Sequence, residues 1–273
     1  MRLGFALVLL LFLSLAAHGE FQQNNLSVTV DLNQDGSAYV KEIVRISMNS
    51  GSPIIYDTAI STANDLSSWR TKTNLDLRFH FNRDVVDITD VTILPQPRDS
   101  CSGCVKDVCT QCFGTIIMRY RLGPIANKSE SGIVFMNHFK PRTINYTINP
   151  EAISFESSSS GNIILPENTR FTINVPAGAI VTKLNPLPKE IGGGVELPIH
   201  NISSFSWSGR TQLSTFEFSF QIEEPLSVEV LDFFMSVRDE ALRVLYSQEG
   251  IAIIFISSVV LISIILLRRH TEK

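Results

Sequence analysis

Alternation of apolar and polar residues is the dominant pattern of this chain. Apolar side chains occupy every second position at 75–81, and the same spacing recurs in the phenylalanine-rich stretch 216–222. Other alternating stretches lie at 26–32, 37–48, 85–94, 116–122, 133–139, 143–148, 171–175 and 205–207. A period of two is typical of strands with one buried face and one solvated face. Helical spacing is almost absent here, so we expect a mostly β fold, an antiparallel β-sandwich.

Turn signals separate the expected strands. Asp35-Gly36 follows the first of them, and Asp-Gly favours the positive φ angles of tight hairpins. The region 20–225 comprises roughly 200 residues, enough for one large β domain or two small ones. We expect a single β-sandwich ectodomain over 20–225.

The period changes after residue 225. Over 226–249, apolar side chains such as Phe233 and Val237 share one helical face, whereas Asp239 and Arg243 lie on the other. This amphipathic pattern predicts a juxtamembrane helix. Its apolar face could dock on the β domain, lie on a bilayer surface or pair with a second copy.

An uninterrupted apolar stretch, IAIIFISSVVLISIILL, occupies 251–267. As a helix it would extend about 25 Å, so we expect one transmembrane helix over 250–267. Arg268 and Arg269 come next, and positive charge beside a span stays on the cytoplasmic side. The short tail 268–273 would therefore lie in the cytoplasm, with the N-terminal ectodomain outside the cell membrane.

The N-terminal end has the features of an export signal. Arg2 precedes a short apolar core, and Ala17-His18-Gly19 places small residues around a cleavage site before Glu20. We expect a signal peptide over 1–19, and an uncleaved N-terminal anchor is the alternative.

Charge limits the class of partner. The chain has 23 Lys and Arg against 27 Asp and Glu, a formal net charge of −4. The basic residues form neither a run nor a stripe along the sequence, so nucleic-acid binding lacks electrostatic support. We expect the membrane, and another membrane or envelope protein, as partners.

Four Asn-x-Ser/Thr triplets are candidate glycosylation sites in an exported chain. Their acceptor residues are Asn25, Asn127, Asn145 and Asn201. Glycan acceptors must be accessible, so we expect these positions at the surface.

Four cysteines form the most distinctive chemical cluster, a hairpin at 101–112. They are Cys101, Cys104, Cys109 and Cys112. An even number in an exported chain indicates disulfides, and a nested pairing of the outer two and the inner two suits a hairpin. Two Cys-x-x-Cys pairs could instead hold zinc through four thiolates, although the spacer is short. A redox-active pair is the third hypothesis.

Other catalytic signatures are absent from the sequence. It contains no Gly-x-Ser-x-Gly, no His-Glu-x-x-His and no phosphate-binding loop. His80 falls on the polar side of its alternating stretch, which predicts a solvated histidine. We therefore expect no enzyme and no cofactor apart from zinc at the cysteines.

Several short motifs follow one another along the chain: DLNQDGSA at 31–38, Val175-Pro176, NPLP at 185–188, WSG at 207–209 and Glu224-Pro225. Their order resembles that of uncharacterised archaeal membrane-anchored surface proteins. The resemblance implies a single exported β-rich domain and supplies no catalytic residues. The cysteines do not belong to the shared pattern.

Together these features predict a non-enzymatic cell-surface module, for binding or for structure, anchored by one C-terminal helix. A metal-binding or redox protein that uses the four-cysteine hairpin is the alternative.

Overall fold

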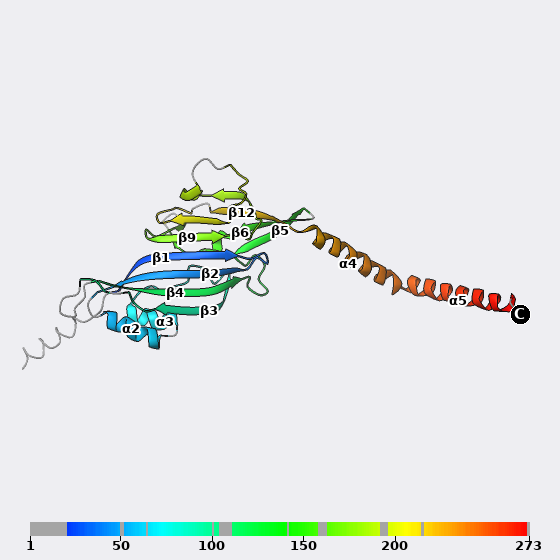
Figure 1. Ribbon diagram of the computed structural model, residues 1–273, viewed down its shortest axis with the longest axis horizontal. Coiled ribbons are helices and arrows are strands. Elements are labelled where there is room, and N and C mark those ends of the chain that lie inside the picture. The colour runs from blue at the N-terminus through cyan, green and yellow to red at the C-terminus, as the bar shows by residue number, and fades with distance from the viewer. Residues whose placement is uncertain are drawn as a thin grey trace, which may run out of the picture. The chain divides into compact units, whose positions relative to one another are not determined.

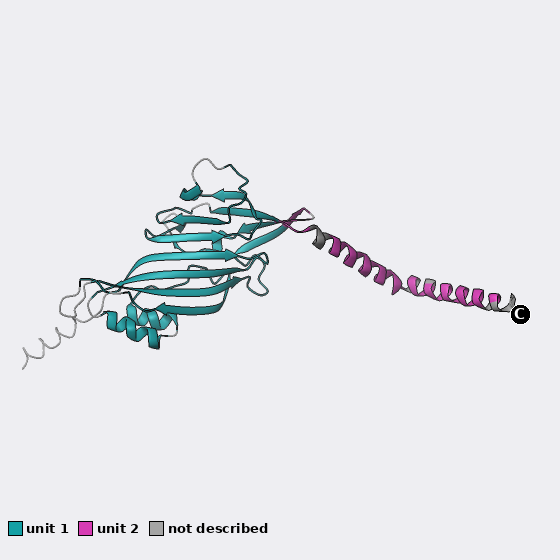
Figure 2. Ribbon diagram, in the orientation of Figure 1, with its two compact units in different colours: residues 1–137, 145–222 teal, residues 138–144, 223–273 magenta. Residues whose placement is uncertain are grey.

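The computed structural model describes residues 21–271 except 50–51, 64, 100, 104–110, 141, 158–162, 192–195 and 214–215. It is mostly β, with two larger sheets and few helices (Figure 1). The chain divides into two compact units (Figure 2). One unit comprises residues 1–137 and 145–222, and the other comprises 138–144 and 223–273.

The larger sheet has six strands in the order β11-β9-β1-β2-β4-β3. Their bounds are β1 Phe21–Leu32, β2 Ala38–Met48, β3 Asp87–Gln96, β4 Cys112–Gly123, β9 Thr169–Asn174 and β11 Ser204–Ser208. Neighbours pair in antiparallel fashion except β1 and β9, which are parallel. The prediction of a purely antiparallel fold is wrong at this pair. The chain passes through the second sheet before it reaches β9, so no hairpin fixes the direction of β9.

The second sheet has four strands in the order β10-β12-β6-β5. Their bounds are β5 Val134–Lys140, β6 Thr143–Ile148, β10 Ile180–Asn185 and β12 Glu217–Glu223. Two short strands, β7 Glu156–Ser157 and β8 Ile163–Ile164, form a separate pair, and the 3-10 turns η1 Pro150–Ala152 and η2 Lys189–Ile191 lie between strands.

The Asp-Gly turn between β1 and β2 is confirmed. Gly36 has a φ angle of 77°. The Asp35 carboxylate accepts hydrogen bonds from the Ser37 amide at 3.0 Å and from its hydroxyl at 2.6 Å. The hydrogen bond from the Ser37 hydroxyl, and after it the one from the Ser37 amide, lowers the pKa of Asp35 below its ordinary value.

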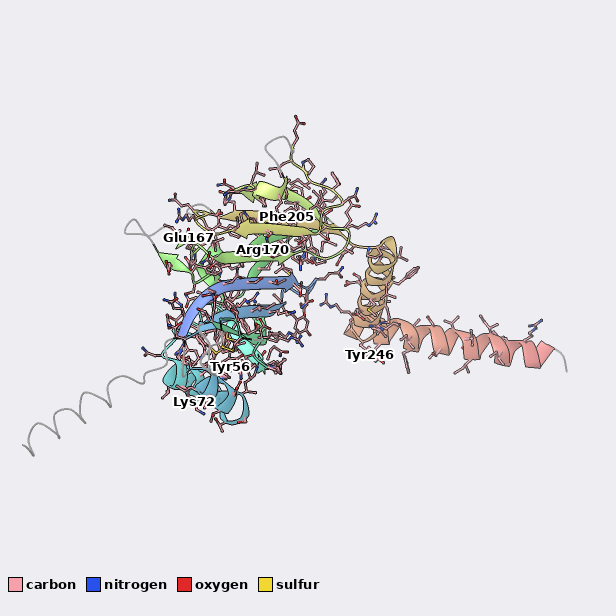
Figure 3. The ribbon with its side chains drawn as sticks, turned by 60° about the vertical axis from the view of Figure 1, so that its left-hand side comes forward. Tyr56, Lys72, Glu167, Arg170, Phe205 and Tyr246 are labelled. Atoms are coloured by element: carbon pink, nitrogen blue, oxygen red, sulfur yellow. A yellow bond between two sulfur atoms is a disulfide. The ribbon has the colours of Figure 1, made fainter. Side chains whose placement is uncertain are left out.

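Aromatic side chains from the two larger sheets contact each other in the core. Phe205 of β11 and Phe218 of β12 have ring centroids 5.2 Å apart, and Trp207 lies 5.3 Å from Phe216. Phe205 is labelled in Figure 3, between the strands of the upper part of the ribbon. These large apolar surfaces leave water together, which drives the association of the strands that carry them.

Two helices, α2 (Ser52–Thr62) and α3 (Leu66–Thr73), lie beside β3 and β4 in Figure 1. The alternation pattern did not predict them. Asp65 caps α3 by accepting a hydrogen bond from the Ser68 amide at 2.8 Å, and Asn74 ends it in the left-handed conformation.

Tyr56 of α2 anchors this helical pair to the sheet. Its ring lies 5.5 Å from that of Trp69 in α3, and its hydroxyl donates to the Gln96 carbonyl at 2.8 Å and accepts from the Thr115 amide at 3.0 Å. Gly114 makes room for the ring, because a Cβ there would stand 2.5 Å from it. Helix α2 therefore covers the inner face of the sheet near β4.

The expected strand at 75–81 is wrong. This stretch is irregular apart from an isolated bridge between Phe81 and Ile153. His80 and Phe81 are both buried, which an alternating strand with one buried face does not allow. Tertiary contacts, described below, hold the segment in place of a sheet ladder.

Within the second unit, α4 (Leu226–Leu245) is followed by α5 (Gln248–Thr271). The parts Phe233–Leu245 and Gly250–Ile265 meet at an angle of 74°. The Ser247 hydroxyl donates to the Val244 carbonyl at 2.7 Å and accepts from the Gly250 amide at 3.0 Å. The helix break thus falls slightly before the expected boundary at 249–250.

Candidate functional site

Three titratable side chains that are distant in the sequence meet beneath the six-stranded sheet. Glu42 of β2 is fully buried, and Tyr120 of β4 and His80 of the segment 74–86 are 2% and 8% exposed. The Glu42 Oε1 atom accepts hydrogen bonds from the His80 backbone amide, at 3.0 Å, and from the Tyr120 hydroxyl. The Oε2 atom lies 2.8 Å from His80 Nδ1.

Aromatic rings enclose this Glu42 cluster, defined as Glu42, His80 and Tyr120. The His80 ring stacks on Phe155 at 5.2 Å, and Phe79 contacts Tyr120 edge-on at 4.7 Å. Burial first, and then the neighbouring carboxylate, raise the pKa of Tyr120 well above its ordinary value. The phenol therefore stays protonated and keeps donating to Glu42.

The sequence prediction of a solvated His80 is wrong. Alternation assigned His80 to the polar side of a strand, but the segment forms no strand, and the imidazole turns inward to meet Glu42. One signal was present in the sequence. Glu42 lies on the same face of its alternating stretch as Val40 and Val44, which are core positions. A carboxylate on a buried face needs hydrogen-bond partners.

The geometry of the cluster suits a structural role, in which it holds the irregular segment against the sheet. Glu42 and Tyr120 have almost no exposed surface, so neither can meet a molecule at the protein surface without a change of structure. The three hydrogen-bonded groups join β2, β4 and the irregular segment that precedes β3. The cluster is therefore a buried hydrogen-bond network, here called the polar brace, that holds the segment 74–86 in place although this segment forms no strand.

The cysteine hairpin lies at the edge of the six-stranded sheet, between β3 and β4. Cys101 and Cys112 form a disulfide with an S–S distance of 2.02 Å. Beside it, Ser102 and Gln111 exchange backbone hydrogen bonds at 2.8 and 3.3 Å. The expected outer pairing is confirmed, and Cys104 and Cys109 lie outside the described residues.

The disulfide bears on the zinc and redox hypotheses. Two of the four sulfur atoms needed for a tetrahedral zinc site are joined to each other, and a disulfide sulfur is no longer a thiolate donor. Among the described residues, no group of three or more His, Cys, Asp or Glu side chains has metal-binding geometry. The arrangement favours a covalent staple for the hairpin.

The four candidate glycan acceptors differ in exposure. Asn25 at the bulge of β1, and Asn127 and Asn201 in loops, are exposed. Asn145 is half-buried within β6, and its side-chain amide donates to the Thr147 hydroxyl at 3.5 Å. Three of the four acceptors are therefore exposed, whereas Asn145 lies in a strand that has a neighbour on either side. Glycosylation at these positions stays a prediction.

The C-terminal helices carry many exposed apolar side chains. In α4 these include Phe233 and Phe234, 64% and 65% exposed, and in α5 they include Phe255 and Leu261 at 69% and 62%. In the described part of the chain no single helix reaches the length and apolarity of a membrane span, whereas the bent pair of α4 and α5 reaches both together.

The expected topology signals fall at the margins of the described structure. Arg268 is exposed and belongs to α5, which also includes the backbone of Arg269. The side chain of Arg269 and the expected signal peptide 1–19 lie outside the described residues. The sequence prediction of a type I membrane protein therefore stays a prediction.

Several motifs behind the resemblance to archaeal surface proteins are packing features. Trp207 is buried and donates from Nε1 to the Pro186 carbonyl at 2.8 Å. A Cβ on Gly209 would stand 1.7 Å from the Glu167 carbonyl oxygen, so that position needs glycine. These contacts explain the motifs by close packing without implying a binding site.

Comparison with known proteins finds no match, either among models of protein families or among curated sequences. The arguments for function therefore depend on the residues and surfaces described above.

Proposed function

We propose that this chain is a non-enzymatic cell-surface module, anchored by α5 and displaying a β-sandwich ectodomain for binding or for structure. The observation that carries the proposal is the apolar surface of the C-terminal helices. In α5, exposed apolar residues occur on all sides, including Ile254, Phe255, Ile256 and Val259. A helix that is apolar all round is suited to a surrounding apolar medium.

The energetics favour a lipid environment for these residues. Each large apolar side chain gains about 1.5–3 kcal/mol when it moves from water to an apolar medium. About six such side chains together gain roughly 9–18 kcal/mol, as much as the stability of a typical domain, so transfer of α5 from water to lipid is strongly favoured. The Arg268-Arg269 pair would hold the C-terminal end in the cytoplasm.

Two further observations support an exported, sandwich-like ectodomain. The Cys101–Cys112 disulfide is typical of oxidising compartments outside the cytosol. Aromatic contacts such as Phe205 with Phe218 join side chains of the two larger sheets, as the inner faces of a sandwich would. The enclosed Glu42 cluster serves as a brace in this proposal and assigns no chemistry to the domain.

The anchor is tested with the full chain, carrying a C-terminal epitope tag, in a host with N-glycosylation. We expect the chain to stay in membranes after an alkaline carbonate wash. Protease added outside the cell should digest the ectodomain and spare the tag. An endoglycosidase should lower the mass of the wild type by more than that of an Asn127→Gln variant.

A matched pair of variants isolates α5. Replacement of Ser257 and Ser258 by Arg places two charges near the middle of the expected span, at a cost of about 5–7 kcal/mol for insertion. The control replaces Ser204 and Ser208, exposed positions of β11 outside both C-terminal helices, by Arg. Release of the first variant alone supports the anchor. Release of the wild type by the wash, or equal retention of both variants, contradicts it.

A further inference from the structure

Basic side chains that are scattered along the sequence gather on the outer face of the six-stranded sheet. The strand register places Lys41, Arg45, Arg119, Arg121 and Arg170 on this face. Asp31 and Asp87 are acidic residues at register positions of the same face, and Asp90 is exposed at the bulge of β3. Two of these cations already have acidic partners: Arg45 pairs with Asp99 at 3.1 Å and Arg121 with Asp35 at 3.2 Å. The positive charge that is left on this face therefore centres on Lys41 and Arg119.

Two of these cations stand directly opposite each other. Lys41 of β2 pairs with Arg119 of β4 in the antiparallel register. Among the described residues neither has an ion-pair partner, and Arg119 is exposed. Like charges at opposed positions lower the stability of a sheet, so the pair has a cost that folding alone does not explain.

Lys41 and Arg119 belong to a row of side chains that runs across neighbouring strands, and the other members of this row carry hydroxyl groups. In register across the sheet come Ser206, Thr172, Thr29, Lys41 and Arg119, with Thr92 at the β3 end. Thr172 and Ser206 hydrogen-bond to each other at 3.1 Å through their hydroxyls. The face therefore presents hydroxyl groups beside cations, and its backbone donors and acceptors are used within the sheet.

A depression of about 690 Å³ opens on the same face. Asn24, Asn25, Ile43, Arg45, Phe113 and Thr115 line it. The Arg45 guanidinium lies over the Phe113 ring at 5.0 Å from its centroid, and at 3.1 Å from the Asp99 carboxylate. Arg45 covers one face of this half-buried ring and is already paired with Asp99, so a sugar would contact the ring beside the two asparagine amides.

We propose that the outer face of the six-stranded sheet binds an acidic polysaccharide, with Lys41 and Arg119 as its main charge contacts and the Phe113 depression as a sugar subsite. Charge complementarity selects a polyanion. The row of hydroxyls and the aromatic depression favour a sugar polymer over an acidic peptide or a nucleic acid. This inference rests on the proposed function, because it names the partner class of the surface module.

The test uses the full chain in mild detergent, produced with its disulfide in a host without N-glycosylation so that Asn25 carries no glycan. Binding to immobilised polygalacturonate is compared with binding to neutral galactan, polyglutamate and single-stranded DNA. We expect binding to polygalacturonate, none to galactan, and a loss of about tenfold or more in affinity when salt rises to about 0.5 M.

Charge-matched double variants identify the face. Replacement of Lys41 and Arg119 by Thr should weaken polygalacturonate binding about tenfold or more. The control replaces Lys183 and Lys189, exposed in and beside β10, by Thr and should change the affinity by less than about twofold. Phe113→Ser should weaken binding to polygalacturonate while leaving the weaker binding to polyglutamate unchanged.

Several outcomes would overturn the proposal. These are failure to bind polygalacturonate, equal loss in the two double variants, or binding of polyglutamate or DNA at least as tight as that of the polysaccharide. Binding in detergent does not depend on membrane insertion, and the wash experiment above does not depend on the sheet face. Failure of one proposal is therefore distinguishable from failure of the other.

Discussion

Replacing Glu42 by Ala removes the acceptor at the centre of the Glu42 cluster. Three donors then lose their partner: the His80 backbone amide, His80 Nδ1 and the Tyr120 hydroxyl. Water has little access to these donors, because Glu42 has no exposed surface and His80 and Tyr120 have little. Each buried donor left without a partner costs about 1–3 kcal/mol, so we expect a loss of about 4 kcal/mol or more in the free energy of unfolding.

Urea unfolding of the full chain in detergent measures this loss. Trp69 and Trp207 are both buried in the β unit, so their fluorescence should report its unfolding. Glu217→Ala on the exposed side of β12 is the matched control and should change stability by about 0.5 kcal/mol or less. Glu42→Gln retains one acceptor oxygen, and we expect it to cost about 1–2 kcal/mol.

A double-mutant cycle with Tyr120→Phe separates the hydrogen bond from general packing. If the carboxylate–phenol contact stabilises the fold, the losses in Glu42→Ala and Tyr120→Phe should be non-additive by about 1 kcal/mol or more. The reasoning is refuted if Glu42→Ala costs no more than Glu217→Ala. Additive losses in the cycle would instead refute the direct contact between Glu42 and Tyr120.

Three further predictions concern other parts of the β unit. Burial raises the pKa of Tyr56 to about 12, so the stability from its neutral hydroxyl is present below about pH 10 and is lost as pH rises through about 12. Tyr56→Phe should therefore flatten the alkaline decline of the urea midpoint, whereas an unchanged slope would contradict this. Replacing Cys101 and Cys112 by Ser opens a loop with a sequence separation of 11 and should cost about 2–3 kcal/mol. The thermal midpoint of this variant should be lower than that of the oxidised wild type, and an equal midpoint would contradict a stabilising disulfide. Gly209→Ala puts a methyl group 1.7 Å from a backbone oxygen and should cost about 3 kcal/mol, whereas Gly123→Ala, with no atom within 4 Å of the added carbon, should be near neutral; equal costs would contradict the close contact.

Local patterns were sufficient for much of the β region. The strands around Asp35-Gly36, the strand after the cysteines and the phenylalanine-rich strand at 217–223 form where alternation predicts them. Each has a continuous apolar face and a turn signal beside it, so its local preference agrees with its place in the fold. The pairing of Cys101 with Cys112 followed from the same logic, because a hairpin brings its two ends together.

The failures occur where tertiary contacts override a local pattern. The segment 75–81 alternates like a strand, yet Glu42 binds both the His80 backbone and its ring, and these bonds replace a ladder. Helix α2 leaves Ile54 exposed and α3 has few apolar residues, so the stability of the pair comes from burying Tyr56 and Trp69 against the sheet. Neither effect is visible in a window of neighbouring residues.

By itself the sequence determined the β-rich class and the apolar character of the C-terminal segment, since each depends on local spacing or composition. It offered the outer disulfide as one of three hypotheses for the cysteines, and the structure selects it. Only the tertiary structure decided that β9 runs parallel to β1, that Glu42 meets His80 and Tyr120, and that scattered cations share one face of a sheet. Those features depend on which strands become neighbours. Strand order is chosen by the packing of the whole core, and the sequence of any one strand does not contain it.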